Sequence, residues 1–132
     1  MKLQASTDYA VRILQYLHEN AGEVYPAMSI AESVGITYPF FIKIANQLKK
    51  KKLINAVQGR NGGYTLGKPA GEISLYDVFR AIEGDLILNH CLNGRPCTRG
   101  KHIDCKFHSV LRGVQGNIIT ELSSRTIADV AS

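Results

Sequence analysis

The chain has 132 residues, of which 45% are hydrophobic and 20% are charged. Such a length corresponds to about one domain and argues against a multidomain enzyme, and the composition argues against a disordered or repetitive chain. No apolar run approaches the ~18 residues of a transmembrane helix, and the N-terminus lacks the apolar stretch of a signal peptide. We therefore expect a cytoplasmic protein without a membrane partner.

Positive charge is concentrated in one part of the chain. The formal net charge is +5, from 16 Lys and Arg against 11 Asp and Glu. No acidic residue lies between Glu32 and Glu72. The basic residues of that interval are Lys43, Lys49, Lys50, Lys51, Lys52, Arg60 and Lys68. A basic stretch without acidic residues suits a polyanionic partner.

A first amphipathic helix is predicted over about residues 7–19. Its apolar residues recur at the i, i+3, i+4, i+7 spacing of one helix face. They are Ala10, Ile13, Leu14 and Leu17. Ser6 or Thr7 is expected to cap this helix, because a hydroxyl oxygen can accept a hydrogen bond from a free backbone N–H there. Asp8 follows, where the helix dipole stabilises a carboxylate.

Two further helices joined by a tight turn are predicted next. Residues 29–32, Ser-Ile-Ala-Glu, have the sequence of a capping box that opens the second helix, and Gly35 is placed to end it. Thr37 can cap a third helix, with Pro39 tolerated in its first turn. The apolar stripe of the third helix is Phe40, Phe41, Ile44, Ala45 and Leu48. We interpret this stripe as packing, and the whole segment as a helix-turn-helix.

A short β-hairpin is predicted after the third helix. Residues 53–57 are β-prone, residues 59–63 have the composition of a turn, and residues 64–66 form the returning strand. Glycines on both sides of Arg60 allow the backbone to approach a partner closely while the arginine projects from the tip. The predicted fold class is therefore a winged helix-turn-helix, mainly α-helical with a small β-hairpin wing.

The C-terminal half is predicted to contain a linker helix, a loop and a long helix. A capping box from Ser74 to Asp77 opens the linker helix, which Gly84 ends. Residues 85–104 show no periodicity and are interpreted as a loop. A long helix is expected from about Asp104 to Ser123, followed by a short terminal helix over residues 126–129.

The apolar stripe of the long helix has no evident partner within a compact winged domain. Its residues are Phe107, Val110, Leu111, Val114, Ile118 and Leu122. We expect this stripe to pair with its copy in a second chain. Residues 1–70 would form the DNA-binding region, and residues 71–132 the linker helix, cysteine loop and dimerisation helix, the two regions forming one compact unit.

The helix-turn-helix and wing predict contacts with double-stranded DNA. The residues placed to meet base edges in the major groove are Thr37, Tyr38, Pro39 and Lys43. Lys49 and Lys50 would contact phosphates without reading sequence, although such a lysine run is as often only a solvated helix end. Arg60, with Gln58 and Asn61, would enter the minor groove, where a narrow A·T tract attracts a guanidinium.

The chain has three cysteines, Cys91, Cys97 and Cys105. An odd, clustered set in a cytoplasmic chain is typical of metal ligands or redox thiols and not of a disulfide framework. His108 adds a fourth donor at spacings wider than the cysteine pairs of zinc ribbons. A loop of this kind can hold an iron–sulfur cluster, which we expect here. Zinc, a thiol–disulfide switch and incidental cysteines are the alternatives.

No catalytic motif is present. The sequence has no nucleophile elbow, P-loop, HExxH motif or dinucleotide-binding fingerprint. We therefore expect a regulator and not an enzyme. A rival interpretation is an iron–sulfur carrier that does not bind DNA, and the basic stretch from Ser33 to Gly71 argues against it.

Almost the whole chain resembles a known family. The opening MKLQASTDYAVR, the wing QGRNGGYTLGKPAGEISLYDV and the three-cysteine loop look like those of the Rrf-type winged-helix regulators. This group of bacterial transcription factors includes the iron–sulfur assembly regulator, the nitric-oxide-sensing repressor and the rhizobial iron-response regulator. The resemblance implies a homodimer through the long helix, a pseudo-palindromic operator, and a 2Fe–2S or 4Fe–4S cluster held by Cys91, Cys97 and Cys105.

The resemblance also implies two candidates for the fourth cluster ligand. Asp8 stands where nitric-oxide sensors have a carboxylate that reaches across the dimer. His108 stands where the assembly regulator has a histidine three residues after the last cysteine. This chain departs from its relatives in the longer gap between Cys97 and Cys105 and in Gln58, where many members have arginine. We expect a repressor whose operator affinity follows cluster chemistry that senses nitric oxide, redox state or iron.

Overall fold

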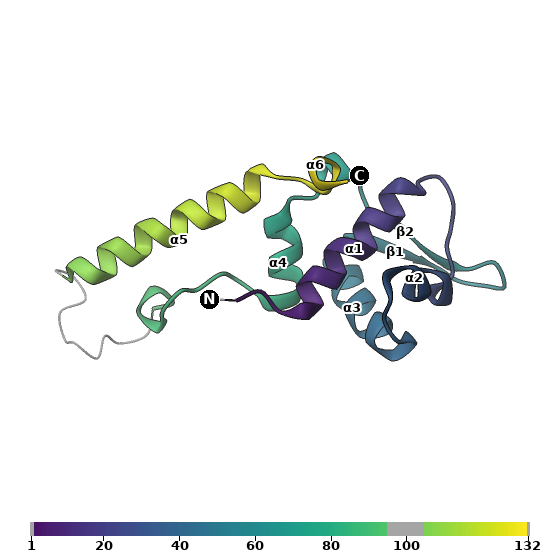
Figure 1. The fold of residues 1–132 in the computed structure, drawn as a ribbon, viewed down its shortest axis with the longest axis horizontal. Coiled ribbons are helices and arrows are strands. Elements are labelled where there is room, and N and C mark those ends of the chain that lie inside the picture. The colour runs from purple at the N-terminus through teal and green to yellow at the C-terminus, as the bar shows by residue number, and fades with distance from the viewer. Residues whose placement is uncertain (1, 95–104, 132) are drawn as a thin grey trace.

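A computed structural model describes residues 2–94 and 105–131 of the chain, and Figure 1 shows their arrangement. The α-helices are α1 (Ala5–Glu19), α2 (Ala27–Val34), α3 (Tyr38–Lys50), α4 (Leu75–Glu83), α5 (Lys106–Ser124) and α6 (Ile127–Val130). Two 3-10 helices are η1 (Ala70–Glu72) and η2 (His90–Leu92). The strands β1 (Ile54–Val57) and β2 (Gly63–Leu66) form an antiparallel hairpin. The predicted fold class, mainly α-helical with a small β-hairpin, is confirmed.

The N-terminal end of α1 is capped by a side chain from another helix. α1 begins after Gln4, whose side chain makes no capping hydrogen bond. Instead, the Glu83 carboxylate at the end of α4 accepts hydrogen bonds from the Gln4 backbone N–H and the Thr7 hydroxyl. The prediction that Ser6 or Thr7 caps α1 is therefore wrong. Thr7 lies inside the helix and is only 4% exposed.

α2 begins earlier than the capping-box pattern predicts. It starts directly after Pro26, so residues 29–32 lie within the helix and do not cap it. A β-bridge between Tyr25 and Tyr64 ends the preceding extended segment. Pro26 has a φ of −63°, which already suits the entry into a helix. The start of α2 is thus fixed by the tertiary bridge and the proline, and the predicted capping box is wrong.

The turn between α2 and α3 follows the prediction. Gly35 ends α2 with a φ of 85°, in the left-handed region that glycine adopts without strain. The Thr37 hydroxyl caps α3 by accepting a hydrogen bond from the Phe40 backbone N–H at 3.3 Å. Pro39 lies in the first turn of α3, as expected. These local contacts set the direction in which α3 leaves the turn.

One hydrophobic core joins the helices to the hairpin. Its largest fully buried side chains are Phe41, Ile13, Leu14, Ile30, Ile44, Leu48, Ile54, Ile73, Ile127 and Val78. The apolar stripes predicted for α1 and α3 are confirmed as core faces, with Phe40 only partly buried. The Phe41 ring packs edge to face against Tyr64 of β2, with the ring centroids 5.3 Å apart. α3 and the root of the wing therefore pack as one unit.

The root of the hairpin is fixed to the entry of α2. Tyr64 and Tyr25 exchange backbone hydrogen bonds of 2.9 and 3.3 Å. A Cβ atom at Gly63 would lie 2.1 Å from the Tyr25 carbonyl oxygen, so this close approach requires glycine. The tip of the hairpin projects from the body, as Figure 1 shows.

α5 extends away from the body, and α6 returns to it (Figure 1). No residue of α5 is buried in the single chain. After α5, the backbone N–H of Ile127 donates to the Ile73 carbonyl at 2.9 Å, and the Gln15 side chain of α1 donates to the Val130 carbonyl at 2.9 Å. The C-terminal end of α5 is therefore fixed to the winged part through α6.

The C-terminal helices begin as predicted. Capping boxes are present at Ser74 with Asp77, which opens α4, and at Thr126 with Asp129, which opens α6. The long predicted helix is α5. Of the described residues, none belongs to a helix with the length and hydropathy needed to cross a bilayer.

Candidate DNA interface and cysteine segment

α3 presents one exposed face along its length. The residues predicted to contact DNA from this helix, and from the cap residue Thr37 before it, are all exposed. They are Thr37, Tyr38, Pro39, Lys43, Lys49 and Lys50. The Thr37 hydroxyl oxygen accepts a hydrogen bond in the cap of α3, so its O–H hydrogen and its methyl group remain for a partner. Tyr38 is 47% exposed although its ring is large and mostly apolar.

Asn46 is an exposed residue of α3 that the sequence interpretation missed. It follows Lys43 by three positions and Pro39 by seven, which places the three residues on the same helix face. An asparagine on such a face can form two hydrogen bonds with adenine in the major groove. The spacing from Pro39 is the signal that could have identified it.

The tip of the wing carries the polar residues predicted for the minor groove. Gln58, Arg60 and Asn61 are all exposed, and Arg60 forms no ion pair with any residue that the structure describes. Gly59 has a φ of 109°, a conformation that favours glycine. The Gly59 carbonyl accepts a hydrogen bond from the Gly62 N–H at 3.0 Å, which closes the turn. The turn therefore projects an unpaired guanidinium into solvent.

An open groove of about 260 Å³ lies between the wing and the helices α2 and α3. Tyr38 and Ile42 of α3 line one side, and Val57 and Gln58 of the hairpin line the other. The exposed face of α3 and the wing are thus two edges of one continuous surface. A duplex on this surface would contact both edges together.

The segment before the first cysteine is fixed to the body. Leu86 is buried, and its backbone N–H donates to the Tyr76 hydroxyl of α4 at 3.4 Å. The Leu88 N–H donates to the Gln115 side chain of α5 at 2.9 Å. Cys91 lies in η2, directly after these contacts, and is partly buried. The predicted loop therefore contains a short ordered helix that carries the first cysteine.

Cys105 lies at the N-terminal end of α5. Its Sγ caps the helix by accepting a hydrogen bond from the His108 backbone N–H at 3.4 Å. The sequence interpretation did not predict this cap. Cys97 lies outside the described residues.

The two candidates for a fourth ligand have different surroundings. The Nδ1 atom of His108 is buried and has no hydrogen-bond partner in the described part of the chain. Asp8 is exposed on α1 and pairs with Arg12, with 2.9 Å between the carboxylate and the guanidinium. Within residues 2–94 and 105–131, no three His, Cys, Asp or Glu side chains gather as a metal site, and the predicted set includes Cys97, which lies outside them.

Comparison with known proteins identifies a family. Residues 3–132 match the family model for Rrf2, described as an iron-dependent transcriptional regulator. The chain is also 32% identical over 130 residues to protein aau3 of Rhizobium meliloti (strain 1021), and this match covers 98% of the chain and 84% of that protein.

Solved structures share the fold. IscR of T. potens has a TM-score of 0.76 and 27% sequence identity, with 98% of this chain and 85% of that chain covered. CymR of B. subtilis, described as the global cysteine regulator, has a TM-score of 0.76 and 21% identity, with 99% and 96% covered. The chain belongs to the Rrf2 family and is a DNA-binding transcriptional regulator.

Proposed function

We propose that this regulator is a homodimeric repressor whose affinity for a pseudo-palindromic operator is set by an iron–sulfur cluster. The observation that carries the proposal is the position of two cysteines, Cys91 and Cys105. Cys91 lies in a short helix fixed to α4 and α5 through its preceding segment, and the Cys105 sulfur lies at the N-terminal end of α5, where it caps the helix. The family description as iron-dependent supports a cluster.

The exposed face of α3 and the wing support a division of roles on DNA. Tyr38, Pro39 and Lys43, near the start of α3, would meet base edges in the major groove. Lys49 and Lys50, at its end, would contact phosphates. Arg60, unpaired at the tip of the wing, would enter the minor groove.

The donors present fit a cluster. Cys91, Cys97 and Cys105 would supply three thiolates, and either His108 or Asp8 the fourth donor. Two observations favour His108: its buried Nδ1 has no partner among the described residues, and Asp8 is already paired with Arg12. When bound, such a cluster supplies a centre that reacts with nitric oxide or oxidants and that depends on iron supply.

Exposed apolar side chains of α5 support the homodimer. Phe107, Val110 and Val114 are 46%, 61% and 43% exposed, and their spacing places them on one side of the helix. Leaving such a stripe in water is unfavourable, and a second copy of α5 offers a matching apolar surface. A two-fold dimer would present two α3 helices to a pseudo-palindromic operator.

Contacts of the segment that contains Cys91 connect it, through α4, to α3. Residues 85–94 follow α4 directly and are bonded to Tyr76 of that helix, and the Gln47 side chain of α3 donates to the Ile82 carbonyl of α4 at 3.5 Å. A rearrangement of the segment around Cys91 would shift α4 and, with it, the helix that reads DNA. A tenfold change in operator affinity needs about 1.4 kcal/mol of coupling.

The test starts with anaerobic reconstitution and measurement of visible absorbance, iron and sulfide. Operator DNA is recovered by selection from random duplexes, and affinity is measured by fluorescence anisotropy at fixed salt with and without the cluster. Cys97→Ala should fold, hold no cluster and bind DNA equally after both treatments. His90→Gln, an exposed residue of the same segment, should behave like the unmodified protein. A response unchanged by Cys97→Ala would refute the cluster assignment.

Two other outcomes would replace the proposal. A colourless protein that binds zinc or forms a reversible disulfide after reconstitution would be a zinc- or thiol-based regulator with its DNA binding intact. A coloured protein that selects no DNA would be an iron–sulfur carrier. For the fourth ligand, His108→Gln is expected to lower iron content and change the spectrum, whereas Asp8→Asn is not; the reverse result would assign Asp8.

A further inference from the structure

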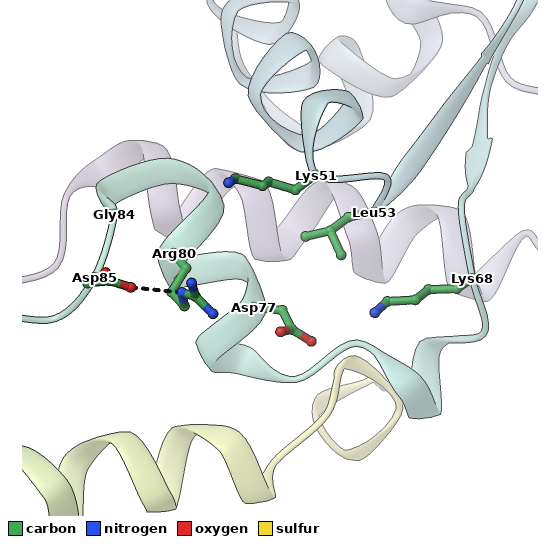
Figure 2. A pocket seen from close by; sticks show the side chains of 7 residues that line it. All are labelled: Lys51, Leu53, Lys68, Asp77, Arg80, Gly84 and Asp85. Atoms are coloured by element: carbon green, nitrogen blue, oxygen red, sulfur yellow. Dashed lines mark hydrogen bonds and ion pairs between the residues drawn. The ribbon is translucent and has the colours of Figure 1, made fainter.

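A cavity of about 300 Å³ lies between α4, the turn from α3 to β1 and the linker after β2. Figure 2 shows its lining residues, which are Lys51, Leu53, Lys68, Asp77, Arg80, Gly84 and Asp85. Sites for small molecules have volumes of about 300–1,000 Å³, so the cavity can hold a small organic molecule. Of the residues that the structure describes, none assigned to DNA or to the cluster lines it.

Three cationic side chains line this cavity from three segments of the chain. Lys51 follows α3, Lys68 follows β2 and Arg80 belongs to α4. Figure 2 shows the two lysines extending from different walls. Neither lysine side chain forms an ion pair or hydrogen bond with any residue that the structure describes. Two positive charges therefore remain without a partner at the cavity.

The two carboxylates at the cavity are already engaged. Asp77 accepts a hydrogen bond from the Ser74 backbone N–H at 2.9 Å, as part of the capping box of α4. Asp85 pairs with Arg80 at 2.9 Å. Arg80 compensates the charge of Asp85, whereas Asp77 keeps its negative charge, so the three cations and two carboxylates of the lining leave one net positive charge for an external anion to compensate.

Arg80 is held by two contacts that leave its Nη1 and Nη2 atoms free to donate hydrogen bonds. Its Nε donates to Asp85, and its guanidinium carbon lies 5.7 Å from the centroid of the Tyr76 ring. The Asp85 contact uses Nε, so Nη1 and Nη2 can still donate to an acceptor in the cavity. Leu53, only 2% exposed, provides an apolar floor beside these cations.

We propose that this cavity binds a phosphate group, carried either by a small phosphorylated molecule or by the DNA backbone. A phosphate has three acceptor oxygens that can meet cations from three directions, and arginine binds it with two parallel hydrogen bonds. The volume leaves room for an organic part against Leu53. A small phosphorylated molecule bound there would join the α3–β1 turn to α4, and so would give the regulator an input besides that of the cysteines.

The first arm of the test titrates inorganic phosphate and glycerol 3-phosphate into the protein by NMR at constant ionic strength. Saturable shifts are expected, and Lys68→Gln and Lys51→Gln should each weaken binding about tenfold, the effect of losing one charge-assisted hydrogen bond. Lys52→Gln removes the same charge next to the cavity without lining it, and it should bind as the unmodified protein does. Binding that none of these variants changes would overturn the proposal.

The second arm measures DNA affinity against salt concentration. If the cavity holds a backbone phosphate, Lys68→Gln will reduce the slope of log affinity against log salt by about one, whereas the slope will stay unchanged if the cavity holds only a small phosphorylated molecule. Lys52→Gln will not change that slope. No binding of the free phosphates together with an unchanged slope in Lys68→Gln would overturn the proposal. Both arms can be run on the cluster-free protein, so a failure of the cluster assignment would not affect them.

Discussion

The winged part of the molecule and α5 differ in where their apolar residues find partners. In the winged part, side chains such as Phe41 and Leu14 are completely buried within one chain. α5 has no buried residue, and Val110 is 61% exposed. The same helical periodicity therefore produces a core in the first region and a surface in the second. The apolar side chains of the first region have their partners within the chain, whereas the exposed apolar side chains of α5 are the surface on which we propose that a second copy packs.

The largest expected effect is on the free energy of unfolding, and it tests whether the core lies in the winged part. Phe41→Ala should lower the free energy of unfolding by about 3–5 kcal/mol, because it empties a fully buried site. Val114→Ala, on the exposed stripe of α5, should change it by less than about 0.5 kcal/mol at concentrations that favour the monomer. Urea denaturation measures both. Equal losses would show that α5 is packed within the single chain.

A second prediction concerns the wing, whose tip is exposed although its root is packed. Arg60→Ala should weaken operator binding about tenfold at matched salt, because a guanidinium contact with DNA is lost. Arg112→Ala, exposed on α5, removes the same charge outside the predicted interface and should have little effect. Fluorescence anisotropy distinguishes them. The wing would be excluded from the interface if the two variants bound equally well.

A third prediction separates the two roles of Cys105, as cap of α5 and as candidate ligand. Cys105→Ser keeps an oxygen that can accept from the His108 N–H, whereas Cys105→Ala removes the cap at a cost of about 1 kcal/mol to the helix end. Hydrogen exchange of the His108 amide should therefore accelerate only in Cys105→Ala. Both variants should lose iron after reconstitution. Retention of iron by Cys105→Ala would show that the thiolate is not a ligand.

The smallest expected effect concerns pH and the junction of α3 with the wing. Burial of the phenol raises the pKa of Tyr64 above its ordinary value of 10.0, and the nearby Tyr38 adds to the shift. Because the folded state favours the neutral phenol, its contribution to stability is complete below pH 10 and is lost as the pH rises through the raised pKa. The alkaline loss of stability should be smaller in Tyr64→Phe. Identical urea midpoints at each alkaline pH would contradict this.

Short sequence patterns correctly predicted a helix start where the capping side chain and the backbone N–H that donates to it lie close in sequence. Thr37, Ser74 and Thr126 each accept from a backbone N–H three residues ahead, so the cap and its partner are visible together. The start of α1 was mispredicted because its acceptor, Glu83, lies 76 residues after Thr7. Contacts of that kind depend on how α4 packs on α1, which no short sequence pattern encodes.

The candidate sites could likewise be predicted only where their residues lie close together in sequence. The exposed residues of α3 and the wing follow from helix spacing and turn composition, and even Asn46 could have been found in that way. The cavity at Lys51, Lys68 and Arg80 could not, because it forms where three segments distant in sequence meet. Cys105 was identified by its chemistry, but its role as a cap depends on where α5 begins.

The length of α5 has a mechanical consequence. The helix has 19 residues and spans about 28 Å at a rise of about 1.5 Å per residue. It is fixed to the body at its C-terminal end through α6, and Cys105 lies at the opposite end. A rotation of about 10° at the fixed end corresponds to a movement of about 5 Å at Cys105. If α5 turned as a rigid rod about that end, a displacement of several ångströms at Cys105 would become a small rotation where α5 joins α6, and each turn added to the helix would reduce that rotation further.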